Sequence, residues 1–173
     1  MADIAGDSML AGVYRVWDEK RRERFAPAPA DIGMLDLPPT ALGNIIIVDV
    51  LGGGERFRFR LVGSKVATSS GSDFTGRYVD EALSGWMRDT VQEQYRAVVA
   101  QKRPGYAVVA FGRGDGRESV RNRRLALPLS SDGVAVDRLL LVSKASSTRL
   151  LQDDLLNIAL NSEPLTVRSF IMI

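Results

Sequence analysis

Apolar residues that recur at helical spacing predict two helices. The first stripe lies near the N-terminus and consists of Leu10, Val13, Tyr14 and Trp17. Asp7 or Ser8 can cap this helix, because either side chain accepts hydrogen bonds from the first turn. The second stripe consists of Met87, Val91, Tyr95 and Val98. It predicts the longest helix of the chain, which Ser84 can cap and which ends near Arg103 because Pro104 stops it.

Alternation of apolar and polar residues predicts strands before and after the second helix. The apolar run 44–51 and the alternating run 56–62 are separated by three glycines and a glutamate, as in a hairpin. Within the second run, the residues expected on one face of the sheet are Phe57, Phe59 and Leu61. The three strands expected after the helix are residues 106–112, 119–129 and 134–145.

This order of elements predicts an α+β domain with a five-stranded antiparallel sheet and helices on one face. A proline-rich connector, expected to be extended, joins the first helix to this domain. After the sheet we expect a short amphipathic helix over 151–158, followed by an apolar β-prone tail at 165–173 that needs cover from this chain or a partner. The predicted units are an N-terminal helix and connector (1–30), the main domain (31–147) and a C-terminal helix and tail (148–173).

Composition excludes several kinds of chemistry. The 173 residues suffice for one globular domain and include neither cysteine nor histidine, which excludes disulfides, thiol nucleophiles, imidazole bases and Cys/His zinc sites. Lysine and arginine number 23 against 21 acidic residues, so nucleic acid is not an expected partner. We find no signal peptide and no apolar run of ~20 residues, and we expect a cytoplasmic protein without a membrane span.

A glycine-serine run at residues 63–76 invites comparison with phosphate-binding loops. Its glycines fit neither the P-loop spacing nor the dinucleotide-binding spacing. We interpret Gly63 as the end of a strand and the next residues as a short helix or turn, with Asp73 and Thr75 bonding locally. Arg77 is expected to pair with Asp73 or Asp80, although it is also the best charged candidate for an anionic ligand.

Charged residues elsewhere are expected to be solvated. The run after Trp17 mixes both signs, which is typical of an exposed helix face. One predicted strand carries four arginines: Arg117, Arg121, Arg123 and Arg124. Alternation places Arg121 and Arg123 on one face and Arg124 on the other, and neighbouring aromatic residues for stacking on bases are lacking. We therefore expect a solvated or dimer-facing sheet here.

Several segments resemble a family of bacterial proteins that consist of little more than one PAS domain. The specific ones are RLVGS (60–64), GSDFTGR (71–77) and LPLSSDG (127–133), supported by RVWDEKR (15–21). The resemblance covers about residues 14–143. One departure lies in APAPADI (26–32), which lacks an arginine expected between the proline and the acidic residue. The resemblance implies a PAS fold with a sensory or regulatory role through a ligand or partner, and no enzymatic activity attached to the fold.

A PAS fold implies a cavity between the sheet and the long helix. Our candidates for its lining are Phe59, Leu61, Phe74, Arg77, Trp86, Tyr95 and Leu127. For the aromatic residues, ordinary core packing is the alternative. Missing cysteine and histidine exclude a cysteinyl flavin adduct and His- or Cys-ligated haem, so the cofactor is unknown and a non-covalent small ligand remains open. We assign no catalytic and no metal-binding residues.

These observations favour a stand-alone PAS-type regulator that binds a small ligand or a partner protein and signals through protein–protein interaction. A homodimer is expected, and its candidate surface is the apolar stripe Leu10, Val13, Tyr14 and Trp17. Two alternatives stay open. One is a small α+β cavity enzyme that uses Asp, Glu or Tyr for acid–base chemistry, and the other is a ligand-free structural interaction domain.

Overall fold

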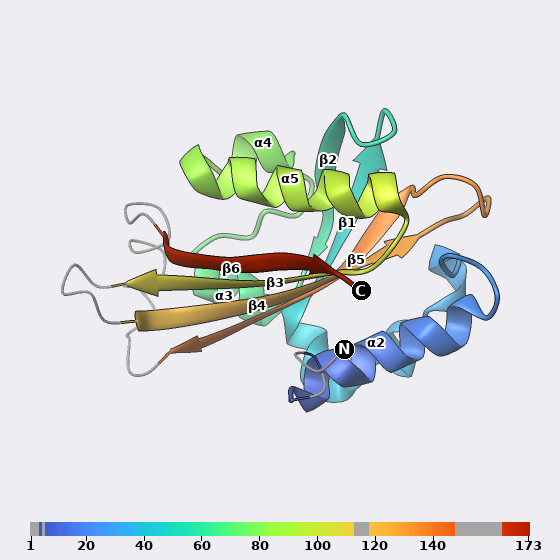
Figure 1. Ribbon diagram of the computed structural model, residues 1–173, viewed down its shortest axis with the longest axis horizontal. Coiled ribbons are helices and arrows are strands. Elements are labelled where there is room, and N and C mark those ends of the chain that lie inside the picture. The colour runs from blue at the N-terminus through green and yellow to red at the C-terminus, as the bar shows by residue number, and fades with distance from the viewer. Residues whose placement is uncertain (1–3, 5, 113–117, 148–163) are drawn as a thin grey trace.

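Two helical layers enclose an antiparallel sheet (Figure 1). The computed structural model describes residue 4 and residues 6–112, 118–147 and 164–173. Within these ranges the strands lie in the order β2-β1-β5-β4-β3-β6 across the sheet. The strands are β1 (Ile45–Leu51), β2 (Arg56–Val62), β3 (Gly105–Gly112), β4 (Glu118–Leu129), β5 (Arg138–Ser147) and β6 (Pro164–Met172). The predicted α+β class, hairpin and three later strands are confirmed.

The helices lie on both sides of this sheet, with α4 and α5 above it and α2 below it in Figure 1. The α-helices are α2 (Ser8–Arg21), α3 (Ser64–Ser70), α4 (Val79–Ala82) and α5 (Gly85–Gln101). The connector is not simply extended, because it contains the short 3-10 helices η1 (Pro29–Asp31), η2 (Met34–Asp36) and η3 (Pro39–Asn44). Proline begins η1 and η3, where its fixed φ suits a first turn and its missing N–H costs nothing.

Helix α2 closes one face of the sheet, which corrects the expectation of a dimer surface on this helix. Leu10, Val13 and Trp17 are 0%, 0% and 2% exposed, and they pack with apolar residues of β4 and β5. The N-terminal helix, predicted to lie outside the main domain, thus covers the face of the sheet opposite α4 and α5. The apolar stripe is also not a free dimer surface, because the chain's own sheet buries three of its four residues, while Tyr14 is partly buried against Trp17.

Two polar contacts hold α2 in place. The Trp17 indole Nε1–H donates a 2.7 Å hydrogen bond to the carbonyl of Pro128 in β4. At the other end Asp7 caps the helix by accepting from the backbone N–H groups of Met9 and Leu10, as predicted. The Lys144 ammonium lies 2.8 Å from the Asp7 carboxylate and ties this cap to β5.

Helix α5 packs on the opposite face of the sheet. The residues that its buried stripe places there are Val91, Gln94, Tyr95 and Val98. Ser84 is the N-cap residue as predicted, although its side chain makes no capping hydrogen bond. The helix ends at Gln101, and Lys102 takes a left-handed conformation with φ of 52°. A separate apolar cluster thus lies between α5 and the sheet.

The C-terminal tail supplies the sixth strand, so the expected count of five is wrong. β6 pairs antiparallel with β3, the strand that would otherwise form this edge of the sheet. Phe170 and Met172 pack into the cluster beneath α5, so these two residues of the tail are covered by this chain, while Ile171 is 40% exposed. Gly105 permits this approach, because a Cβ there would lie 2.5 Å from the Phe170 ring. The predicted helix over 151–158 lies outside the described residues.

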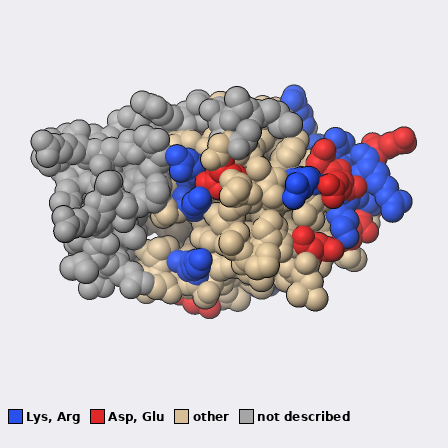
Figure 2. Space-filling view, turned by 90° about the horizontal axis from the view of Figure 1, so that it is seen from below, with Lys and Arg blue, Asp and Glu red and all other residues tan. Residues whose placement is uncertain are grey.

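The charged run after Trp17 forms an exposed face of mixed sign, as predicted. Figure 2 views the molecule from the α2 side and shows blue and red side chains interleaved at its right end. The pairs formed there are Arg21 with Asp18 at 2.7 Å, Arg24 with Asp31 at 2.6 Å and Lys20 with Asp36 at 3.3 Å. Exposed pairs of this kind add little stability.

Replacing Trp17 by phenylalanine tests the indole contact. We expect Trp17→Phe to lower the free energy of unfolding by about 1–3 kcal/mol, because a buried carbonyl loses its donor. Tyr14→Phe is the matched control, since it alters the neighbouring ring without touching this bond. Urea unfolding followed by far-UV circular dichroism measures both, and equal midpoints for the two variants would contradict the role given to Trp17.

The Asp7–Lys144 contact predicts a pH dependence. Hydrogen bonds from Lys144, Leu10 and Met9 outweigh burial and hold the pKa of Asp7 below its ordinary value. A carboxyl whose folded pKa is depressed stabilises the fold above the unfolded pKa, about 4, and this stabilisation is lost as the pH falls through the folded value. Asp7→Asn keeps a capping oxygen but cannot ionise.

We therefore expect Asp7→Asn to be less stable than the wild type at pH 7 by about 1 kcal/mol, and the difference to shrink below pH 4. Urea midpoints measured from pH 3 to pH 7 give the comparison, with exposed Asp89→Asn as a control for charge removal. A difference that stays constant across this range would show that the charge of Asp7 is not involved.

Candidate functional site

Arg124 of β4 and Tyr95 of α5 come together between α5 and the sheet, and Gln94 precedes Tyr95 in the buried stripe of α5. Arg124 alternates with Leu125 on β4, and Leu125 packs beneath α2, so Arg124 lies on the α5 side. Gln94 and Tyr95 belong to the buried stripe of α5 and are 6% and 4% exposed. The charge of Arg124 acts on the phenol of Tyr95, which places these two groups near each other.

The guanidinium of Arg124 is partly withdrawn from water, because the residue is partly buried on the α5 side of β4. Burial lowers its pKa, and the interaction with Tyr95 opposes this only in part. In the described part of the chain no carboxylate forms an ion pair with Arg124. A buried charge is ordinarily paired, since removing it from water costs several kcal/mol. Among the described residues, this arginine thus has no acidic partner for its charge.

Gln94 and Tyr95 add hydrogen-bonding capacity beside this cation. Among the described atoms, the Gln94 amide nitrogen Nε2 is buried without a hydrogen-bond partner. Burial raises the pKa of Tyr95 to about 12, with the Arg124 charge pulling it down, so its hydroxyl stays protonated at physiological pH. Its ring packs edge-on against Phe57 at 5.4 Å. This part of α5 thus offers an N–H donor from Gln94 and an O–H donor from Tyr95, and the Tyr95 hydroxyl lies near the positive charge of Arg124.

The predicted cavity residues do not all face this group. Phe59 and Phe74 lie on the α5 side and stack on each other at 5.8 Å, while Arg77 lies 5.8 Å above Phe74. Trp86 is partly buried in the first turn of α5. Leu127 is on the opposite face, fully buried beneath α2, which corrects its assignment to the α5 side.

A bulge in β2 corrects the position of Leu61. Ile47 pairs with Leu61 but Val48 pairs with Phe59, so Arg60 is an extra residue in the ladder. The strand's alternation changes phase there. Leu61 therefore lies on the face of Ile47 and not on the face of Phe59, contrary to the expectation from the sequence pattern.

The glycine-serine run plays a structural part, as predicted. Gly63 ends β2 and donates to the Ile45 carbonyl at 2.8 Å, and a Cβ on it would lie 2.5 Å from the Gly43 oxygen. α3 follows and ends at Gly71, whose φ is 68°. Asp73 accepts from the backbone N–H and the hydroxyl of Thr75, which confirms the local bonding.

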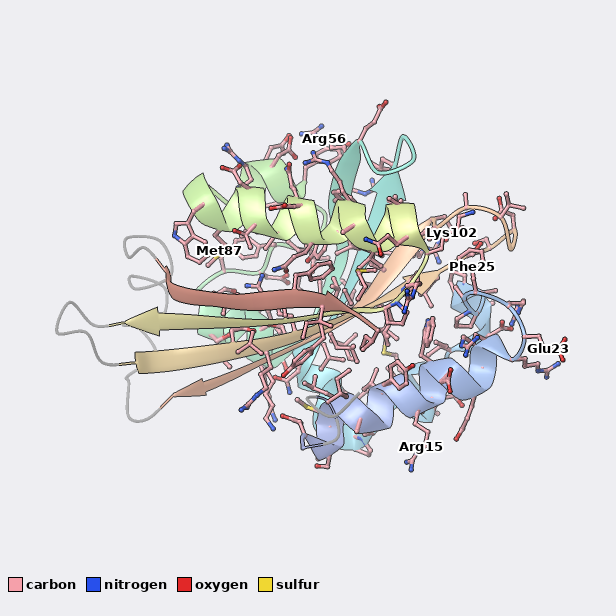
Figure 3. All side chains as sticks on the ribbon, viewed as in Figure 1. Arg15, Glu23, Phe25, Arg56, Met87 and Lys102 are labelled. Carbon is pink, nitrogen blue, oxygen red and sulfur yellow. The ribbon has the colours of Figure 1, made fainter. Side chains whose placement is uncertain are left out.

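Arg77 does not form the ion pair predicted for it. Its guanidinium donates to the backbone carbonyl of Glu81 at 3.0 Å. Asp80 and the Glu81 side chain instead pair with Arg56, whose guanidinium also lies 3.5 Å from the centre of the Tyr78 ring. The reason is position, because Arg56 begins β2 directly beside α4, as Figure 3 shows.

The alternative of a cavity enzyme needs a carboxylate beside Tyr95 or Tyr106. The charged group acting on Tyr95 is Arg124, and Tyr106 packs in the apolar cluster beneath α2. Among the described residues no group of three acidic side chains is placed to hold a metal ion. The charged group described beside Tyr95 is thus a cation and not a carboxylate.

Comparison with known families decides the classification. The family model of the PAS domain matches residues 7–142. The chain belongs to the PAS domain family. No curated protein matches it.

The family match begins at Asp7, the residue that caps α2, so α2 is part of the PAS region. The match ends in β5, so β6 lies beyond it. PAS domains serve generally as sensory or regulatory modules, and many mediate protein interaction. None of the helices in the described ranges has the length and apolar character to cross a membrane.

A partly buried cation with no acidic partner among the described residues should lower the stability of the ligand-free domain. We expect Arg124→Gln to raise the Tm of refolded, ligand-free protein by on the order of 2–4 °C, which corresponds to about 1 kcal/mol in a chain of this size. Arg123→Gln is the matched control, since it removes the same charge from the adjacent residue on the opposite face. A Tm for Arg124→Gln below that of Arg123→Gln would show that Arg124 already has its partner within the chain.

Proposed function

We propose that this PAS protein is a stand-alone regulator that binds a small acidic ligand between α5 and β4 and passes its occupancy to a partner protein. The observation that carries the proposal is the partly buried guanidinium of Arg124 close to Tyr95, whose helix neighbour Gln94 has a buried amide without a partner among the described atoms. Membership of the PAS family supports the general sensory or regulatory role. The side chains of Arg124, Gln94 and Tyr95 indicate the chemistry of the ligand.

An anion satisfies all three groups at once. A carboxylate or phosphate oxygen accepts from guanidinium N–H groups in a charge-assisted bond, and such bonds are about twice as strong as neutral ones. The Gln94 amide and the protonated hydroxyl of Tyr95 can donate to the same ligand. A neutral apolar ligand would leave the charge of Arg124 unpaired, and a cation would be repelled. The donor set therefore favours an acidic ligand.

Partner binding completes the proposed role. The stripe expected to form a homodimer is occupied by the sheet, so a dimer or partner interface must use other surfaces. β4 contains Arg124, and its Pro128 carbonyl holds Trp17 of α2. A shift of β4 on ligand binding would therefore reach α2 on the other side of the sheet. We propose that partners respond to this displacement.

Native mass spectrometry tests ligand binding. The full chain is purified without denaturation, and its intact mass is compared with that of Arg124→Gln and Arg123→Gln. We expect a co-purified small molecule on the wild type and on Arg123→Gln, and its loss from Arg124→Gln. The released compound is expected to ionise as an anion.

Two outcomes would contradict the proposal. One is bare protein for all three samples even after incubation with an extract of small metabolites, which would favour the ligand-free interaction domain. The other is equal occupancy of Arg124→Gln and the wild type. Circular dichroism of each variant verifies that loss of ligand does not follow from loss of fold.

A further inference from the structure

A groove lies on the opposite side of the sheet from Arg124. Its volume is about 310 Å³, within the range of small-molecule sites. One wall comes from the connector, with Ile32 and Leu37, and the other from the sheet, with Ile47 and Leu140. Figure 1 shows the connector and α2 together below the sheet. The walls are predominantly apolar, yet the groove also has two arginines, Arg60 and Arg138.

The arginines surround one buried carboxylate. Asp49 of β1 is 7% exposed. Arg60 Nη1 lies 3.4 Å from its Oδ1, and Arg138 Nε lies 3.3 Å from the same oxygen. Arg58 Nη2 donates to the other oxygen at 2.9 Å. One negative charge thus stands against three positive charges, which leaves an excess of two.

The two groove arginines retain donors beyond those given to Asp49. Arg60 approaches the carboxylate through Nη1 and Arg138 through Nε, and the described part of the chain supplies no other hydrogen-bond acceptor to either side chain. Both guanidiniums touch the same oxygen, so they meet at one end of the groove. A guanidinium carries five N–H donors, and most of these are available there.

The bulge in β2 creates this combination. In a regular strand, Arg60 and Leu61 would point to opposite faces of the sheet. Because Arg60 is the extra residue of the bulge, both side chains line the groove. Leu61 remains 38% exposed, an apolar surface without full cover next to a cationic group. One arginine is enough to neutralise the charge of Asp49, and Arg58 makes the shortest contact with this carboxylate. The charges of Arg60 and Arg138 therefore exceed what Asp49 requires.

We infer that this groove is a second binding site, specific for an amphipathic anion with an acidic head group and a short aliphatic chain. The head group would bind Arg60 and Arg138, where the excess positive charge lies. The aliphatic chain would cover Leu61, Ile47 and Leu140. This site rests on different residues from the proposed α5 site and is independent of it.

Sodium decanoate, below its micelle concentration, is the probe. Isothermal titration of the full chain compares it with acetate, which has the head group alone, and with decyltrimethylammonium, which has the chain with the opposite charge. We expect decanoate to bind at least roughly tenfold more tightly than either. Comparable affinity for decanoate and the cation would overturn the assignment of charge.

Variants locate the site. Arg60→Gln combined with Arg138→Gln should weaken decanoate binding roughly tenfold or more, while Asp49 keeps Arg58 as its partner. Leu61→Gln should weaken decanoate but not acetate. The matched control carries Arg15→Gln and Arg22→Gln, which remove the same charge from α2; Figure 3 shows Arg15 pointing away from the sheet. Equal decanoate affinity in the double variant and this control would overturn the proposal.

Amide chemical shifts separate this site from the one beside α5. Decanoate should perturb Ile47, Leu61 and Leu140, and it should still do so in Arg124→Gln. Perturbations confined to α5, or lost in Arg124→Gln, would mean that decanoate binds beside α5 and would refute the groove. Failure of the groove in this experiment leaves the α5 site standing, and native mass spectrometry tests that site separately.

Discussion

The hydrogen bond from the Trp17 indole to the Pro128 carbonyl fastens helix α2 to strand β4 of the sheet. The cover of one sheet face and the shape of the groove both depend on this attachment. The sheet has apolar residues on both faces, so neither face can be left to water, and α2 must cover one of them. The bond is 2.7 Å long and buried, and it sets the position of α2 over β4. With α2 in place, the connector runs back along the sheet and forms one wall of the groove.

The two faces differ in how they treat charge. Beside α5, a partly buried arginine has no described counterion, whereas across the sheet a buried aspartate has three arginines. Both arrangements leave positive charge in excess near apolar walls. The faces are linked at one end, because Phe25 packs against both apolar clusters and lies 5.3 Å from the Lys102 ammonium at the end of α5 (Figure 3). Phe25 is thus a packing contact shared by the two faces.

Local pattern predicted the elements well, and long-range packing supplied the rest. Helical spacing identified α2 and α5, and alternation separated Arg123 from Arg124. The spacing of apolar residues does not show which face of the sheet a helix covers. The apolar stripe of α2 therefore suggests a partner surface in the sequence, although the chain's own sheet covers it in the structure. The bulge at Arg60 has no glycine or other local signal, because it arises from pairing with β1. Gln94 falls within the stripe of α5 but is polar, and only its burial marks it as unusual.

A crystal structure of the full chain, purified without denaturation, would show directly whether an acidic ligand binds beside α5. The account predicts electron density for a small acidic molecule between α5 and β4, in contact with the Arg124 guanidinium and the Gln94 amide. It would be contradicted by a structure in which Arg124 pairs with a carboxylate of its own chain and Gln94 is fully hydrogen-bonded within the fold.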